Sequence, residues 1–362
     1  MDCGANGTKR IVDFRSDTIT KPTAAMRAAM ASAEVDDDIV TVDPTMDELQ
    51  KEMARIFGKE AALFVPSGTM GNLISVLVHC EARASEAIIG SESHINVYEQ
   101  GGMATLGGVF PSIVPNNPDG TMDLRAVENA IKPLDDEHFA TTRLICIENT
   151  HNRCGGRCVS VEYTDQVGQL AKRYGLRLHV DGARIFNAST ALGVSPERLV
   201  RAADTVSVCL SKGLAAPAGS VIVGSHEFIE KAKRLRKALG GAMRQVGILA
   251  APGLVALKDM VCRLYEDHSN ARLLAEGLCG MKGLQVDMSA VETNIVNVDV
   301  TKSRFTAEEL CRAMGKIGIL SYDLTKTSIR LVTHYHISED DVRYTLACFQ
   351  RVLADENGRH VP

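Results

Sequence analysis

Two side chains with complementary chemistry follow two apolar segments near the middle of the chain. Lys212 follows the β-branched run 205–210, and Asp181 follows the apolar run 176–180. A lysine amine forms a Schiff base with a carbonyl group, and a carboxylate keeps a pyridine nitrogen protonated. Pyridoxal 5'-phosphate is a cofactor that needs both groups. The pair therefore predicts a pyridoxal-phosphate site attached at Lys212, although most single lysines are solvated surface charges.

A glycine-rich segment, Ser67–Gly71, lies between an apolar strand and a helix. Backbone N–H groups at a helix N-terminus bind anions, and glycine lets the anion approach closely. The same segment also fits an ordinary tight turn. A phosphorylated cofactor elsewhere in the chain favours the phosphate interpretation, with Thr69 adding a hydroxyl.

Several charged residues have both a chemical and a structural interpretation. Asp181 could be a helix N-cap, and His94 could be structural or could stack on a cofactor ring. Arg184 could hold the phenolic oxygen of the ring. Arg330, in a β-type run, is either a solvent-facing edge residue or a bidentate ligand for an amino-acid carboxylate. Lys237 and Arg244 flank the glycines at 240–241 and are either charged helix ends or phosphate ligands reached across a subunit boundary.

The elements that position these residues alternate along the chain. Continuous apolar strands separated by helical stretches predict an α/β fold with a largely parallel sheet buried on both faces. The expected strands are 61–65, 87–90, 108–114, 143–148, 176–180, 205–210 and 220–223. We expect three parts: an N-terminal arm and helix (1–45), a large cofactor-binding domain (46–252), and a long helix (253–278) that leads into a small C-terminal α+β domain (253–362).

Composition limits the function classes. The chain has 362 residues, 45% of them hydrophobic and 23% charged, which is typical of a globular protein. Its net charge of −5 has no basic block, so nucleic acid and anionic membranes are not expected as partners. The first residues show neither a signal peptide nor an amphipathic targeting segment, which predicts a cytoplasmic protein with a mitochondrial location left open. No spacing of the ten cysteines predicts a metal site.

Taken together, these motifs resemble the low-specificity L-threonine aldolases, which have the aspartate aminotransferase-like fold of pyridoxal-phosphate enzymes. The resemblance covers about residues 12–353. The segments that carry it are 13–22, 60–72, 148–152, 179–188, 210–214, 240–245 and 329–334. It implies a large domain with a seven-stranded, mostly parallel sheet and a small C-terminal domain.

The resemblance also implies roles for individual residues. Lys212 would form the Schiff base, Asp181 would contact the pyridine nitrogen, and His94 would stack on the ring. The phosphate would be bound by Gly68, Thr69 and Met70, together with Lys237 and Arg244 of a neighbouring subunit. The substrate carboxylate would be bound by Ser16, Arg184 and Arg330, and His138 would help to activate a water near the substrate hydroxyl. A homotetramer, arranged as a dimer of dimers with the active site at a dimer interface, is expected.

The implied reaction is the cleavage of L-threonine or L-allo-threonine to glycine and acetaldehyde. His94, His138 and a histidine-held water are the candidate bases. One loop departs from the family pattern, because Val40, Thr41 and Val42 replace an aromatic residue, a glycine and an acid. Loss of the glycine removes the freedom to adopt a positive φ. Two alternatives stay open. The changed loop allows a catalytically impaired paralogue that binds the cofactor, and another enzyme of the same fold, such as a β-eliminating lyase, would share Asp181 and Lys212.

Overall fold

The computed structural model describes residues 10–354, which divide into two compact units. The larger unit comprises Thr20–Arg263, and the smaller unit combines the chain before Thr20 with the chain from Leu264 onward. From the sequence we expected boundaries after residues 45 and 252. Residues 1–9 of the expected arm and 355–362 of the expected C-terminal domain lie outside the described residues.

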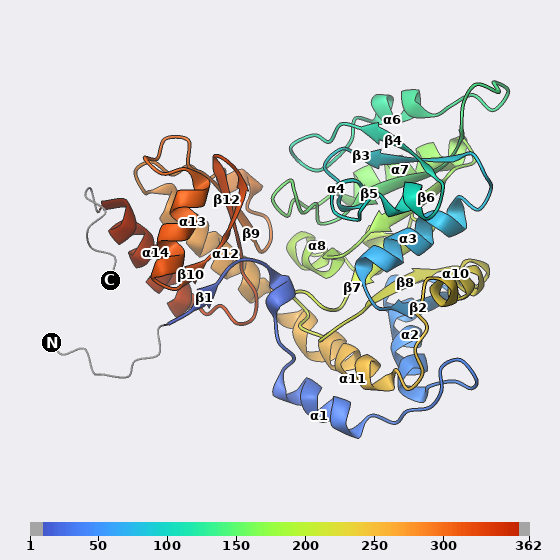
Figure 1. Cartoon of the computed structure of the whole chain (residues 1–362), viewed down its shortest axis with the longest axis horizontal. Coiled ribbons are helices and arrows are strands. Elements are labelled where there is room, and N and C mark those ends of the chain that lie inside the picture. The colour runs from blue at the N-terminus through green and yellow to red at the C-terminus, as the bar shows by residue number, and fades with distance from the viewer. Residues whose placement is uncertain (1–9, 355–362) are drawn as a thin grey trace. The chain divides into compact units, whose positions relative to one another are not determined.

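The larger unit is built around a seven-stranded sheet with the strand order β2-β8-β7-β6-β5-β3-β4 (Figure 1). The strands are β2 (Ala61–Val65), β3 (Ser85–Gly90), β4 (Phe110–Val114), β5 (Thr141–Glu148), β6 (Arg177–Asp181), β7 (Thr205–Cys209) and β8 (Ser220–Gly224). Neighbouring strands pair in parallel, except that β8 runs antiparallel to both β2 and β7. The predicted fold class, with its mostly parallel sheet, is therefore confirmed.

Helices connect these strands. They are α1 (Ala24–Ser32), α2 (Pro44–Phe57), α3 (Gly68–His79), α4 (His94–Val97), α5 (Gly102–Thr105), α6 (Leu124–Ala130), α7 (Val161–Arg173), α8 (Ile185–Leu192), α9 (Pro196–Leu199), α10 (His226–Ala238) and α11 (Gly247–Val255). Helix α2 begins after the N-cap Asp43 and ends at Gly58, whose φ of 60° is left-handed. Among the described residues, no helix is both long and apolar enough to cross a membrane.

Helix α3 lies close against the sheet, and two of its glycines explain how. A Cβ atom on Gly68 would lie 2.8 Å from the Sγ atom of Cys209. A Cβ atom on Gly71 would lie 2.4 Å from the Oγ atom of Ser207. The N-terminal turn of α3 therefore approaches β7 at a distance that only glycine permits.

The smaller unit contains a three-stranded antiparallel sheet with the order β11-β12-β9. Its elements are β9 (Ile295–Asp299), β10 (Ile319–Leu320), β11 (Tyr322–Thr325), β12 (Ser328–Val332), α12 (Leu264–Cys279), α13 (Ala307–Lys316) and α14 (Glu339–Ala354). The short strand β1 (Val12–Asp13) pairs in parallel with β10. Val12 and Phe14 are buried in the core of this unit, which explains why the start of the described chain belongs to it.

The long helix predicted over 253–278 is helical throughout, but it is not α-helical along its whole length. Helix α11 already begins at Gly247 and ends at Val255, a π-helical turn (Ala256–Met260) and a 3₁₀ turn (Val261–Arg263) follow, and α12 begins at Leu264. Pro252 lies inside α11 and has no N–H for the helical hydrogen bond. The irregular turns thus follow a helix whose hydrogen-bond ladder is already interrupted.

Candidate active site

Asp181 and Lys212 lie at the same edge of the large sheet. Asp181 is the last residue of β6, and Lys212 lies in the segment that follows β7. Strands β6 and β7 are adjacent and parallel, with Asp181 opposite Ser207. Both residues therefore belong to the carboxyl ends of neighbouring strands, where open α/β sheets bind their ligands. The hydroxyl of Thr20 donates to the backbone oxygen of Lys212 at 2.8 Å and helps to fix this segment.

The Asp181 carboxylate is buried and hydrogen-bonded. The Nδ2 atom of Asn72 donates to Asp181 Oδ2 at 2.8 Å, and the backbone N–H of Ala183 donates to Oδ1 at 3.1 Å. Only 3% of Asp181 is exposed. Two hydrogen bonds donated to a buried carboxylate favour its ionised form, and an ionised carboxylate is suited to bind a positively charged partner.

His94 begins helix α4, after β3, and is fixed by two glutamates. Its backbone N–H donates to Oε2 of Glu148 at 2.6 Å, and its ring Nδ1 bonds Oε1 of Glu99 at 2.7 Å. One side-chain atom from each of His94, Glu99 and Asp181 lies within 4.8 Å of the other two. This spacing is also compatible with cation ligands, but here direct hydrogen bonds link His94 to Glu99, and the amide of Asn72 links Glu99 to Asp181.

The charges in this cluster influence one another. Burial is the main cause that raises the pKa of Glu99, and the nearby charge of Asp181 raises it further. Burial lowers the pKa of His94, but the hydrogen bond that its ring donates to Glu99 and the charges of Asp181 and Glu99 outweigh burial, so the pKa is raised. The charge of Lys212 acts in the opposite direction on His94. The amine, the acid and the imidazole are therefore electrostatically coupled.

The expected phosphate-binding residues Gly68, Thr69 and Met70 form the first turn of α3. The N-cap Ser67 accepts a hydrogen bond from the backbone N–H of Met70 at 3.2 Å, which closes this turn. The Thr69 side chain is exposed. A cavity of about 320 Å³ lies beside Thr69, Asn72 and Glu99. The backbone N–H groups of Gly68 and Thr69 have no partner among the described residues, so they are the donors that this helix N-terminus offers to an anion.

Arg184 also lies at this edge. It follows β6, precedes α8 and is buried, with 6% of the residue exposed. Its guanidinium donates to the side-chain oxygen of Asn152 at 3.3 Å, while the backbone N–H of Asn152 donates to Glu148. The arginine expected near the phenolic oxygen is therefore held on the same side of the sheet as Asp181.

The expected substrate ligands Ser16 and Arg330 lie near each other in the smaller unit. Arg330, on β12, donates to the backbone oxygen of Arg15, the residue before Ser16, at 3.2 Å. The Ser16 hydroxyl accepts hydrogen bonds from the backbone and the side chain of Thr18. Arg330 is thus turned toward the segment that carries Ser16.

Three expected residues form no hydrogen bond with Asp181 among residues 10–354. Lys237 is an exposed residue near the end of α10, and Arg244 lies in the segment between α10 and α11. His138 lies in the loop before β5, with 82% of its side chain exposed, and its ring bonds Asp136 at 2.7 Å. Because β5 is parallel to β6, this loop is at the amino end of the strands, opposite Asp181. Within one chain, the structure does not bring His138 to the cluster.

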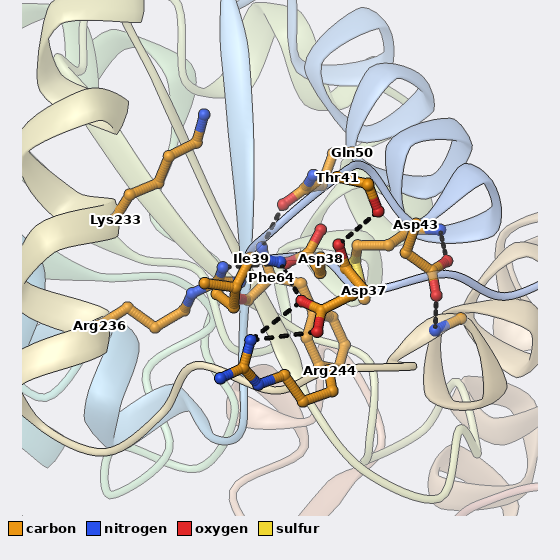
Figure 2. Close-up of polar contacts among 12 residues, drawn as sticks. Asp37, Asp38, Ile39, Thr41, Asp43, Gln50, Phe64, Lys233, Arg236 and Arg244 are labelled. Carbon is orange, nitrogen blue, oxygen red and sulfur yellow. Dashed lines mark hydrogen bonds and ion pairs between the residues drawn. The ribbon is translucent and has the colours of Figure 1, made fainter.

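The loop that departs from the family pattern is held by Asp37 (Figure 2). Asp37 accepts hydrogen bonds from the backbone N–H groups of Ile39 and Val40 and from the guanidinium of Arg244. Those backbone bonds, followed by Arg244, lower the pKa of Asp37. The Thr41 hydroxyl donates to the Asp37 backbone oxygen at 2.9 Å, and Thr41 is not among the residues with positive φ. The loss of glycine at position 41 therefore does not strain this turn.

The sequence did not single out Asn72, Glu99 or His179. The side chain of Asn72 bonds Glu99, Asp181 and the ring of His179, which in turn bonds Thr205. The sequence signal that could have pointed to Asn72 is the presence of polar residues on a helix face that otherwise packs against the sheet. Asn72 and Ser75 interrupt the apolar run of α3 and are fully buried. A buried polar residue requires a partner, so the interruption is informative once burial is known.

Comparison with known proteins agrees with the geometry. Residues 13–301 match the family model for β-eliminating lyases. The chain is 58% identical to the probable low-specificity L-threonine aldolase 2 of Arabidopsis thaliana, covering 96% of this chain and 98% of the relative. It is 59% identical to low-specificity L-threonine aldolase 1 of the same plant, covering 95% and 97%.

A solved structure supports the fold. The threonine aldolase of Leishmania major superposes with a TM-score of 0.78 at 20% identity, covering 94% of this chain and 99% of the other. An identity this low supports only the fold, whereas the plant relatives match nearly their entire length. The chain therefore belongs to the low-specificity L-threonine aldolase family, within the β-eliminating lyases.

Proposed function

We propose that this chain is a pyridoxal-phosphate-dependent lyase that cleaves L-threonine or L-allo-threonine to glycine and acetaldehyde. The observation that carries the proposal is the pairing of buried Asp181 with Lys212 at the carboxyl ends of adjacent strands. Membership of the threonine aldolase family adds the substrate class. The ordered turn around Asp37 gives no support to the impaired-paralogue alternative.

The residues present fit this cofactor. Lys212 would be the point of covalent attachment, and Asp181 would hold a proton on the pyridine nitrogen. The first turn of α3 would bind the phosphate through Gly68, Thr69 and Met70, where a Cβ atom on Gly68 has no room. Bound pyridoxal phosphate supplies an electron sink for a carbanion at Cα.

The protein residues would then control which bond breaks and where the protons go. Ser16 and Arg330 would bind the substrate carboxylate and so set the Cα–Cβ bond in the reactive direction. A base removes the β-hydroxyl proton, the Cα–Cβ bond breaks, acetaldehyde leaves, and Cα takes a proton to give glycine. Arg184 would hold the phenolic oxygen of the ring as an anion.

Among the candidate bases, His94 has the stronger support within one chain. Its Nδ1 atom bonds Glu99, and its Nε2 atom has no hydrogen-bond partner among residues 10–354. A neutral imidazole nitrogen is suited to accept a proton near neutral pH. His138 lies at the opposite end of the sheet, so a role for it would require a second copy of the chain.

We also propose a homotetramer in which neighbouring subunits complete each site. In the structure of one chain, Arg244 bonds Asp37 rather than the first turn of α3, and Lys237 is exposed. Lys237 is therefore accessible to a neighbouring copy, and so is Arg244, whose side chain is 54% exposed beside Asp37, as the family resemblance implies. Sedimentation of the purified protein would test the oligomeric state.

The function is tested with purified protein supplied with pyridoxal phosphate and either substrate. We expect acetaldehyde and glycine in equal amounts, and loss of both in Lys212→Ala. The exposed Lys172→Ala on α7 is the matched control and should behave as the wild type. Release of ammonia and a keto acid instead would favour a β-eliminating lyase. Cofactor binding without any product would favour the impaired paralogue.

A further inference from the structure

We propose that Asn72 and Glu99 are positioning residues of this site. Glu99 fixes the ring and the tautomer of His94, and Asn72 holds the carboxylates of Glu99 and Asp181 at set positions. The role in catalysis rests on the proposed function, but the hydrogen-bond network itself does not. Neither residue contacts a reacting atom in the scheme above, so both act through His94 and Asp181.

The two carboxylates come from separate parts of the larger unit and meet at one amide. Asn72 Nδ2 donates to Glu99 Oε1 and to Asp181 Oδ2, each at 2.8 Å. Asn72 and Glu99 are buried, with 2% and 7% of their surfaces exposed. An amide nitrogen has two hydrogens, and each carboxylate accepts one of them. Asn72 therefore spans the two acids and leaves no spare donor.

The rest of the network fixes the orientation of this amide. Since Asn72 Nδ2 faces two acceptors, its Oδ1 atom must accept, and the Nε2 atom of His179 lies 3.1 Å away as the donor. His179 is then neutral with its proton on Nε2, because burial lowers its pKa to about 4. Its Nδ1 atom accepts from the hydroxyl of Thr205 at 2.9 Å.

The network continues to the other end of the sheet. Thr205 Oγ1 gives its hydrogen to His179, so it accepts from Nε2 of His79 at 2.9 Å. Burial is the main cause that lowers the pKa of His79 to about 3, and the ring is therefore neutral. Every donor meets an acceptor in one arrangement of protons. A wrong rotamer of Asn72 would place its oxygen against two carboxylates, which is unfavourable in a buried site.

Glu99 determines which nitrogen of His94 carries the proton. The carboxylate accepts from His94 Nδ1 at 2.7 Å, so the exchangeable position of the neutral ring is Nε2. The ionisable groups with a direct bond or charge effect on His94 are Glu99, Asp181, Lys212 and, through the backbone N–H, Glu148. Glu99 raises the pKa of His94 and Lys212 lowers it. Removal of the Glu99 carboxylate should therefore lower the pKa of His94.

The decisive comparison is Glu99→Gln against Glu86→Gln. Glu86 is also buried, with 1% exposed, and it accepts one hydroxyl hydrogen bond, from Thr142, in β3 at the amino end of the sheet. It has no bond to Asn72, His94 or Asp181 among the described residues. Both substitutions replace a buried carboxyl group with an amide of nearly the same shape.

The first readout is the nuclear magnetic resonance titration of His94 in labelled, cofactor-free protein, assigned with His94→Asn. We expect His94 to titrate at a lower pH in Glu99→Gln and at the wild-type pH in Glu86→Gln. An unchanged titration in Glu99→Gln would overturn the proposal, whether or not the protein is an aldolase. If wild type fails to bind pyridoxal phosphate, the proposed function fails while this titration still decides the inference.

The second readout is the visible circular dichroism of the cofactor-loaded protein. We expect Glu99→Gln and Asn72→Leu to change the band, with kcat reduced about tenfold and KM within about twofold. Glu86→Gln should retain the wild-type band. If Asn72→Leu does not fold, Glu99→Gln alone decides. An effect of equal size in Glu86→Gln would assign the change to general loss of packing and would contradict a positioning role.

Discussion

Around Asp181, most hydrogen bonds join one side chain to another, whereas around Asp37 and Asp43 most of them join a side chain to the backbone. Asn72 needs a carboxylate at both Glu99 and Asp181. Asp43, by contrast, accepts from the backbone N–H groups of Met46 and Gly247. A backbone donor is present whatever the neighbouring side chain is. In the cluster around Asp181, each side chain must therefore be of a particular type for its partners to be bonded. In the loop, only the aspartates must be of a particular type.

This difference accounts for the unusual residues at 40–42. Val40 and Val42 are exposed, by 76% and 61%, and the turn that carries them is closed by Asp37 (Figure 2). Their side chains can change without breaking a hydrogen bond of the turn. The changed loop is thus compatible with an intact site.

The largest effect on stability is expected from Thr205→Val. Thr205 is fully buried, and its hydroxyl bonds the rings of His79 and His179. The isosteric valine leaves two buried ring nitrogens without partners, which we expect to cost about 4 kcal/mol of unfolding free energy. Urea denaturation measures this, and the exposed Thr105→Val should stay within about 0.5 kcal/mol of wild type. A cost below about 1 kcal/mol would show that the side-chain network is not stabilising.

A somewhat smaller effect is expected from Asp43→Ala, which breaks the loop. Asp43 is fully buried, caps α2 through Met46 and also binds the first backbone N–H of α11. Loss of a cap and of a further buried acceptor should destabilise the protein by about 3 kcal/mol. The control Asp47→Ala removes only a surface ion pair with Lys51 and should cost about 0.5 kcal/mol. Equal losses in the two variants would contradict the assigned role of Asp43.

Acid should weaken the buried network before it affects the loop. The pKa values of His79 and His179 are lowered to about 3 and about 4, below the ordinary 6.5. The unfolded chain therefore binds more protons than the folded chain between these values. Their contribution to stability is complete above pH 6.5 and is lost as the pH falls toward 4 and then 3.

The slope of this loss is at most about 1.4 kcal/mol per pH unit for each histidine. Urea denaturation between neutral pH and the acidic range measures it. We expect a shallower slope in His79→Gln, because one of the two neutral rings is gone, and an unchanged slope in the exposed His226→Gln. Parallel slopes for wild type and His79→Gln would contradict a neutral, buried His79.

The smallest effect is expected within the loop itself. Thr41→Gly restores the residue type of the family pattern, yet Thr41 has no positive φ and its hydroxyl bonds Asp37. Glycine should therefore destabilise the protein, by about 0.5–1 kcal/mol. Val40→Ala, at an exposed position, should change the stability by less than about 0.5 kcal/mol. A stabilising Thr41→Gly would indicate that the threonine strains the turn.

The sequence predicted the sheet and the acid–amine pair because both depend on local signals. Apolar runs mark the buried strands, and Asp181 and Lys212 stand directly where two of them end. The family resemblance added the fold and the reaction. Asp181 and Lys212 could be placed in the site because side chains at the carboxyl ends of adjacent parallel strands lie at the same edge of the sheet.

The remaining features depend on contacts between distant segments. Val12 pairs with Ile319, and no local pattern predicts a two-residue strand with so remote a partner. Asn72 and Glu99 meet Asp181 only after α3 and α4 have packed on the sheet. His138 matched a family motif, but a motif match contains no information on which end of the sheet the loop occupies. The direction of these side chains and the pairing of remote strands therefore could not be predicted from the sequence.

The most direct test of the account is to locate the cofactor on the chain. Protein loaded with pyridoxal phosphate is reduced with borohydride, digested and analysed by peptide mass spectrometry. We expect a pyridoxyl group on Lys212, and loss of that modification without transfer to another lysine in Lys212→Ala. Modification of a different lysine, or none after loading, would contradict the assignment of Asp181 and Lys212 as the centre of the site.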